Sequence, residues 1–171
     1  MRLDCEGDIV SGFQKNRTFA AKNIITMAKK LITLMLLVFT AVLAQAQVGK
    51  MIGEWNTYDD KTGDLRSTIR ITENKGAYQA VIIAVYEKDA NGKFYELKPP
   101  YPKDYEGVVG TQIFKEMKVD GEHLKGKIYD PESQKTYNGK VTYKAKHDEL
   151  SVRGSLDRAG ILGRSQIWKR K

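Results

Sequence analysis

Short runs of β-branched and aromatic residues, separated by clusters of turn residues, recur from Gln47 to the end of the chain. In one run, Tyr137, Val141 and Tyr143 all fall on the same set of alternate positions. A period of two indicates strands with one buried face, and this spacing of runs is typical of an antiparallel meander or barrel. We predict eight strands, over residues 51–58, 65–73, 77–88, 108–117, 123–129, 136–145, 149–156 and 164–170.

An all-β fold with eight antiparallel strands can close into a barrel of the lipocalin or streptavidin type. Closure removes exposed edges and leaves room inside for one small ligand. Glycines within the runs fit a curved sheet; they are Gly53, Gly110, Gly126, Gly139 and Gly154. A two-sheet sandwich is the alternative. Residues 95–107 contain three prolines, which cannot donate to a ladder, and are predicted to form a long loop.

An export signal precedes the predicted domain. A short positive segment, Met27–Lys30, leads into an apolar run over 31–43, and Ala44-Gln45-Ala46 has the small-x-small pattern of a cleavage site. These features predict a cleavable signal peptide over 27–46 and an exported protein, periplasmic or secreted. The run is shorter than the about 20 residues that cross a bilayer, so we expect no integral membrane span after cleavage. Residues 1–26 are interpreted as an over-extended start or a long n-region, and 47–171 as one domain.

Charge and cysteine content narrow the functional classes. The chain has a formal net charge of +8, but acidic and basic residues are interspersed along 47–171. This mixing favours a solubilising surface and no nucleic-acid partner. The single cysteine, Cys5, precedes the predicted domain, so we expect neither a disulfide nor a thiolate metal site there.

Four motifs in order carry a resemblance to a known family: Gly53–Trp55, Gly126–Glu132, Leu150–Gly154 and Gly163–Trp168. Over 53–170 the chain resembles the exported bacterial proteins catalogued as domain of unknown function 2147. The resemblance implies location in the bacterial envelope and a β-barrel-like domain, without an established activity. The chain departs from the family at 98–102, where a proline-rich segment replaces an Asn-Pro-containing connection. The Gly-x-Trp opening and a basic residue near the last strand also resemble lipocalins, in which that tryptophan plugs one end.

Arg164, Gln166 and Trp168 alternate, so they share one face of the last predicted strand. Arg153 lies on the strand before it. If these side chains point into the barrel, two guanidiniums, an amide and an indole would bind an anion with a flat or apolar part. The alternative is that Trp168 packs in the core and Arg164 pairs with Asp130 or Glu132.

The Asp130-Pro131-Glu132 motif has a structural explanation for its first two residues, because Asp and Pro favour the first two positions of a type I turn. This explanation does not extend to Glu132 or to the flanking tyrosines. The candidate ligand-binding residues are therefore Arg153, Arg164, Gln166, Trp168, Asp130, Glu132, Tyr129 and Tyr137.

Signals for catalysis are weak. His123 and His147 lie beside turns, and the acidic turn over 59–64 lacks the ligand spacing of a calcium loop. No nucleophile motif or phosphate-binding glycine loop is present. We predict no catalytic residue, metal or cofactor, and a non-catalytic envelope barrel that binds a small or anionic ligand or a protein partner. A hydrolase-like enzyme using Asp130 or Glu132 is the alternative.

Overall fold

The computed structural model describes residues 26–36, 47–157, 160 and 162–171. Contacts divide the chain into two units, Met1–Leu43 and Ala44–Lys171. In the first, residues 26–36 are helical. Within the described ranges, no helix has the length and apolar character needed to cross a membrane. The cleavage predicted after Ala46 and most of the segment 1–26 lie outside the described residues, and they remain predictions.

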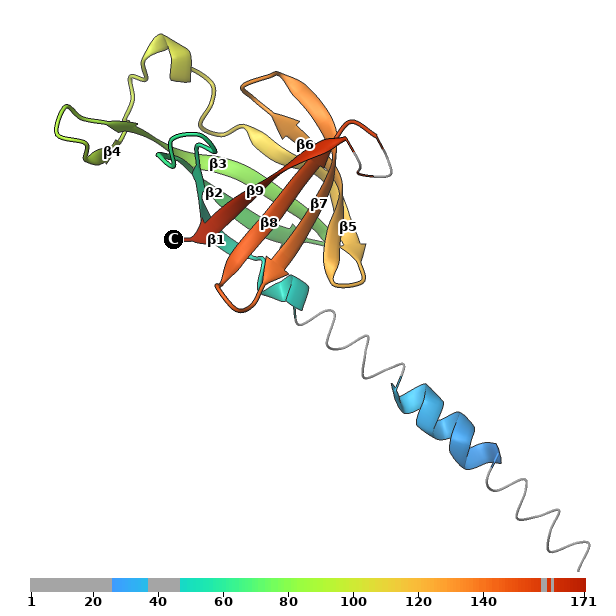
Figure 1. Ribbon diagram of the computed structural model, residues 1–171. Coiled ribbons are helices and arrows are strands. Elements are labelled where there is room, and N and C mark those ends of the chain that lie inside the picture. The colour runs from blue at the N-terminus through green and yellow to red at the C-terminus, as the bar shows by residue number, and fades with distance from the viewer. Residues whose placement is uncertain (1–25, 37–46, 158–159, 161) are drawn as a thin grey trace, which may run out of the picture. The chain divides into compact units, whose positions relative to one another are not determined.

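The second unit is built from strands (Figure 1). In chain order they are β1 (Gly53–Tyr58), β2 (Leu65–Asn74), β3 (Ala77–Lys88), β4 (Phe94–Glu96), β5 (Gln112–Asp120), β6 (His123–Asp130), β7 (Lys135–Lys144), β8 (Glu149–Ser155) and β9 (Gly163–Arg170), with a 3₁₀ helix, η1 (Lys103–Tyr105), between β4 and β5.

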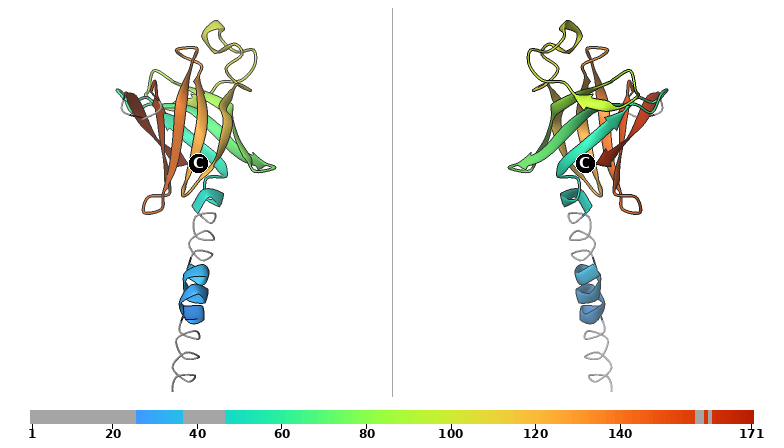
Figure 2. Two further views of the ribbon diagram at one scale, coloured as in Figure 1. Left: turned by 90° about the vertical axis from the view of Figure 1, so that its right-hand side faces the viewer. Right: turned by 90° about the vertical axis from the view of Figure 1, so that its left-hand side faces the viewer.

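Eight of these strands form a closed antiparallel barrel. The hydrogen-bonded order is β2-β1-β9-β8-β7-β6-β5-β3, and β2 also pairs with β3, which closes the ring. Figure 2 shows the strands wrapping around one axis. The β4 strand pairs only with β3 and stays outside the ring. The all-β antiparallel barrel predicted from the sequence is confirmed, and the sandwich is excluded.

The main differences from the predicted strands lie between β3 and β5. The strand expected from residue 108 begins at Gln112, because the Val108 carbonyl accepts the Thr111 N–H in a turn; Gly110 and Thr111 bond to Ile82 of β3 just before the strand begins. Residues 95 and 96, predicted as loop, belong to β4 and pair with the end of β3. The prolines that argued against a ladder begin only at Pro99, after β4 has ended.

One end of the barrel is closed by the segment that precedes β1. Trp55 is fully buried and donates from Nε1 to the Met51 carbonyl at 2.8 Å. The Arg170 guanidinium lies 4.1 Å from the centre of the Trp55 ring and donates to the carbonyl of Lys50 at 2.7 Å. Gly53 has φ +129°, and a Cβ there would lie 3.0 Å from Arg170 Nη1, so this position requires glycine. We call Trp55, Arg170 and the segment that precedes β1 the closed end.

Candidate functional site

A cavity of about 760 Å³ opens at the other end of the barrel. Along β9, Arg164, Gln166 and Trp168 line it, whereas Arg170, at the far end of the same strand, belongs to the closed end. The volume lies within the range of about 300–1,000 Å³ that is typical of small-molecule sites. The cavity therefore runs from an open mouth into the barrel interior.

The deep walls of the cavity are apolar. They are formed by Ile69, Ile82, Val85, Ile113, Ile128, Val152 and Trp168. Trp168 is 3% exposed and stacks on Phe114, with ring centres 5.7 Å apart and an interplanar angle of 11°. Thr57 and Ser67 add a polar pair to the wall, with their hydroxyl oxygens 2.7 Å apart. Each hydroxyl thus has a partner, so neither needs a ligand to satisfy it.

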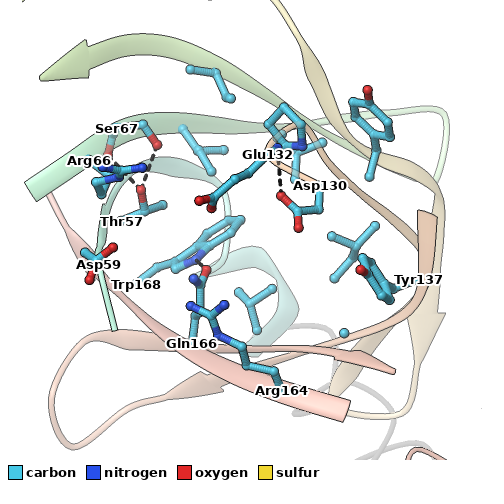
Figure 3. A pocket seen from close by; sticks show the side chains of 18 of the residues that line it. Thr57, Asp59, Arg66, Ser67, Asp130, Glu132, Tyr137, Arg164, Gln166 and Trp168 are labelled. Atoms are coloured by element: carbon cyan, nitrogen blue, oxygen red, sulfur yellow. Dashed lines mark hydrogen bonds between the residues drawn. The ribbon is translucent and has the colours of Figure 1, made fainter. Parts of the chain in front are cut away.

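The mouth is charged. Its carboxylates are Asp59, Asp104, Asp130 and Glu132, and its guanidiniums are Arg66 and Arg164. Figure 3 labels all of these except Asp104. Acidic side chains thus outnumber basic ones by four to two among the lining residues. The exposed side chains of Leu156 and Leu162 complete the rim.

The turn between β6 and β7 has the geometry that the sequence motif predicts. Asp130 accepts the backbone N–H of Glu132 at 3.0 Å and the Ser133 hydroxyl at 2.7 Å, one on each carboxylate oxygen. The Ser133 hydroxyl also lies 3.2 Å from that of Tyr137. By contrast, the Glu132 carboxylate accepts no hydrogen bond from a described residue and points into the cavity (Figure 3). Asp130 therefore stabilises the turn, and the turn directs the Glu132 side chain into the cavity.

Arg164 forms its ion pair with Asp60 rather than with Asp130 or Glu132. Barrel closure places β9 against β1, and Asp60 lies in the turn that follows β1. The hydrogen bond that Arg164 donates to Asp60 raises the pKa of Arg164 above its ordinary value, and the charges of Glu132 and Asp130 make smaller contributions. The pairing expected from the sequence is wrong because it left out the contact between the first and last strands.

Arg153 does not line the cavity. In the β8–β9 register it lies opposite Ser165, while Gly154 lies opposite Arg164, so Arg153 is on the outer face. Its guanidinium donates to the Gly160 carbonyl at 2.6 Å and to the Ser165 hydroxyl at 3.1 Å. The predicted pair of inward guanidiniums is therefore reduced to one.

The other predicted residues lie at the cavity. Tyr137 packs against the backbone of Gly154, where a Cβ would lie 3.5 Å from the Tyr137 Cβ. Gln166 accepts a long hydrogen bond, 3.4 Å, from Trp168 Nε1. Tyr129 reaches the cavity edge, and its ring lies 4.9 Å below the Lys115 ammonium. Seven of the eight predicted residues thus line one cavity; whether they bind a ligand remains a prediction.

Sequence reasoning missed several rim residues. Asp59 was interpreted as a turn residue, and its carboxylate does accept the backbone N–H groups of Lys61 and Thr62, each at 2.9 Å. These bonds lower its pKa, Thr62 first, with a smaller contribution from Arg66. Asp59 and Arg66 nevertheless also line the mouth, as does Asp104 of η1. No local pattern in the sequence sets these three apart from other exposed charges.

The lining residues can hold an apolar body inside the barrel and a polar group at its mouth. In the described part of the chain, no group of three or more His, Cys, Asp or Glu side chains is arranged to hold a metal ion.

Comparisons with known proteins agree with this architecture. The chain is similar in structure to a protein described as "Protein HP1028 from the human pathogen Helicobacter pylori belongs to the lipocalin family", with a TM-score of 0.52 and 20% sequence identity. The match covers 70% of this chain and 82% of that one. No curated protein matches the chain. At this identity the likeness concerns the fold alone.

The family comparison reaches further, because it spans nearly the whole barrel from β1 to β9. A family described as "Uncharacterized protein conserved in bacteria (DUF2147)" matches residues 53–170. The chain therefore belongs to the DUF2147 family, with a lipocalin-like barrel as its fold.

Proposed function

We propose that this protein is an exported barrel that binds a small amphiphile, with the apolar body of the ligand in the cavity and its polar head at the mouth. The observation that carries the proposal is the change in lining, from the apolar walls around Trp168 to the charged rim. Burial of an alkyl chain in such walls contributes about 0.8 kcal/mol per CH₂ group. The predicted signal peptide supports export.

The charge of the rim favours a positively charged head. Four carboxylates face two guanidiniums, and Arg164 is already paired with Asp60. The anionic ligand predicted from the sequence relied on Arg153 and Arg164, but Arg153 lies outside the cavity and the second guanidinium at the mouth is that of Arg66. Because carboxylates remain in excess over Arg66 and Arg164, we favour an amine or another cationic head, which Glu132 can reach from the β6–β7 turn.

The hydrolase-like alternative has less support. Both oxygens of the Asp130 carboxylate accept hydrogen bonds within the turn, and this carboxylate therefore already has a structural role. A general acid or base must also lie within hydrogen-bond reach of the reacting group and its partner. Glu132 has no such partner residue among the described side chains of the mouth.

Three probes with the same 12-carbon chain test the proposal: dodecylamine and dodecanoate, each below its micelle concentration, and dodecanol below its solubility limit. Trp168 lines the cavity, so binding should change tryptophan fluorescence. It should also raise the melting temperature, because a ligand that binds only the folded state stabilises it. We expect affinity to fall in the order amine, alcohol, carboxylate.

The Glu132→Gln variant isolates the contribution of the head. It should weaken amine binding about fivefold, which corresponds to about 1 kcal/mol for a partly exposed charge pair, and leave alcohol binding unchanged. Glu106→Gln removes an exposed carboxylate that does not line the cavity and serves as the control. Tighter binding of the carboxylate than of the amine would refute the cationic head; no binding of any probe would refute the amphiphile.

A further inference from the structure

Lysines that are separated along the chain line up across the outer face of β5, β6 and β7. Lys118 lies directly opposite Lys125, and Lys125 lies directly opposite Lys140. Neighbouring strands are about 4.8 Å apart, so this row holds three ammonium-bearing side chains within about 10 Å. The row continues on β8 with Arg153.

A second row lies nearer the mouth, where Lys115 is opposite Lys127. The next positions in this row are Asn138 and Ser155, and none of the register positions in either row is a carboxylate. Asp120, outside both rows, pairs with Lys125 at 2.5 Å. We call Lys115, Lys118, Lys125, Lys127 and Lys140 the basic face.

The opposite side of the barrel has the reverse arrangement. On β1 and β2, Glu54 is directly opposite Arg70, and the two form an ion pair of 2.7 Å. Opposite charges in such positions stabilise a sheet, whereas like charges directly opposite destabilise it. The basic face therefore opposes folding, and a partner that supplies negative charge would relieve the repulsion.

Exposed apolar side chains adjoin the basic face at the mouth. Lys127 donates to Asn138 at 2.8 Å, and Asn138 in turn donates to the Leu156 carbonyl at 3.3 Å. Leu156 is 71% exposed, and Leu162 is 66% exposed. A soluble polyanion would satisfy the lysines only, whereas a bilayer offers anionic headgroups to the lysines and an apolar layer to the leucines.

We infer that the basic face, with Leu156 and Leu162 at its mouth-side edge, docks this protein on the surface of an anionic membrane. The lysines supply attraction to the headgroups, and the leucines enter the boundary of the acyl layer. The inference does not depend on which head the cavity ligand carries.

Vesicle sedimentation tests the docking. The protein is expressed from the full-length gene and purified in the form that accumulates in the cells. The vesicles are phosphatidylcholine alone or with about 30% phosphatidylglycerol. Binding should require the anionic lipid and should weaken when ionic strength rises from about 0.1 M to about 1 M, because the Debye length falls from about 10 Å to about 3 Å.

The Lys118→Glu/Lys140→Glu variant should reduce binding to anionic vesicles by about tenfold or more, given the contribution of each basic residue near a charged surface. The same variant places two carboxylates opposite Lys125, so its melting temperature should rise, which also checks that it folds. Lys75→Glu/Lys93→Glu makes the same change in net charge at the β2–β3 and β3–β4 turns and should bind like the unaltered protein.

The leucines separate a membrane from a soluble polyanion. Leu156→Ser/Leu162→Ser should weaken vesicle binding severalfold while leaving binding of inorganic polyphosphate unchanged. The inference is overturned if the two charge-reversal variants lose binding equally, if neutral vesicles bind as well as anionic ones, or if polyphosphate binds and anionic vesicles do not.

Discussion

The two ends of the barrel are each built around an arginine of β9 that pairs with an aspartate from a turn. At the closed end, Arg170 pairs with Asp148 at 2.6 Å. At the mouth, Arg164 pairs with Asp60. The Arg170 side chain is 32% exposed and that of Arg164 is 66% exposed. An Arg–Asp pair thus occurs in two different environments, and the two arginines lie six positions apart on β9.

The surroundings of each pair determine what it contributes. Arg170 also covers the Trp55 ring and donates to the Lys50 and Ile52 carbonyls. Cation–π contacts strengthen when they are shielded from water, whereas an exposed ion pair contributes about 0–1 kcal/mol. The closed end should therefore hold the fold together, and the mouth should be free to serve a ligand.

Removal of the Trp55 side chain should have the largest effect on stability. Trp55→Ala empties the fully buried centre of the closed end and should cost about 3–5 kcal/mol in free energy of unfolding, as for other large buried aromatics. Urea unfolding measures the change, with the exposed Tyr95→Ala as control. A cost below about 1 kcal/mol would mean that the closed end is not where stability resides.

Arg170→Ala should have the next largest effect. The change removes the cation over Trp55, the charged partner of Asp148 and the donor to the Lys50 and Ile52 carbonyls. Loss of a charged hydrogen-bond partner in a partly buried site costs about 1.5–3 kcal/mol. Arg170→Lys keeps the charge but not the planar fork, and it should recover only part of the loss. Full recovery with lysine would show that geometry at the closed end is unimportant.

The sequence predicts the strands better than the contacts between them, for a physical reason. The strand pattern is a local signal, because alternation and turn residues act over a few positions, whereas the position of Trp55 at one end is implied by the resemblance to lipocalins. The face that Arg153 occupies depends instead on the register between β8 and β9, which alternation within either strand does not fix. The Arg164–Asp60 pair needs residues 104 positions apart to meet through barrel closure.

The surface charges show the same limit. Acidic and basic residues alternate along the chain, which predicts a mixed surface. Pairing of β5, β6 and β7 nevertheless brings Lys118, Lys125 and Lys140 into one row. Order along the chain is therefore a poor guide to order across a sheet, because each neighbour across a ladder comes from a different strand.

The pH dependence of stability provides a smaller test of the closed end. The hydrogen bond from Arg170, followed by one from Tyr143, holds the pKa of Asp148 below its ordinary value of 3.8. A lowered folded pKa adds stability above the unfolded pKa, and this stability is lost as pH falls through the folded pKa. The stability difference between the unaltered protein and Asp148→Asn should therefore be constant from about pH 7 to 5 and shrink below about pH 4. Asp104→Asn, which removes a carboxylate outside any described ion pair, should show no such trend in urea unfolding.

The smallest effect on stability is expected for Arg164→Ala at the mouth. The Arg164 side chain is 66% exposed and its carboxylate partner is 34% exposed, so the loss should be below about 1 kcal/mol. Ligand binding should respond more strongly. Without Arg164, the rim loses one of its two guanidiniums and Asp60 is released from its pair, so the mouth becomes more negative. Dodecylamine should then bind more tightly, and dodecanoate more weakly, than to the unaltered protein. A loss of stability as large as that of Arg170→Ala would mean that the two ends are alike, and the assignment of stability to one end and binding to the other would fail.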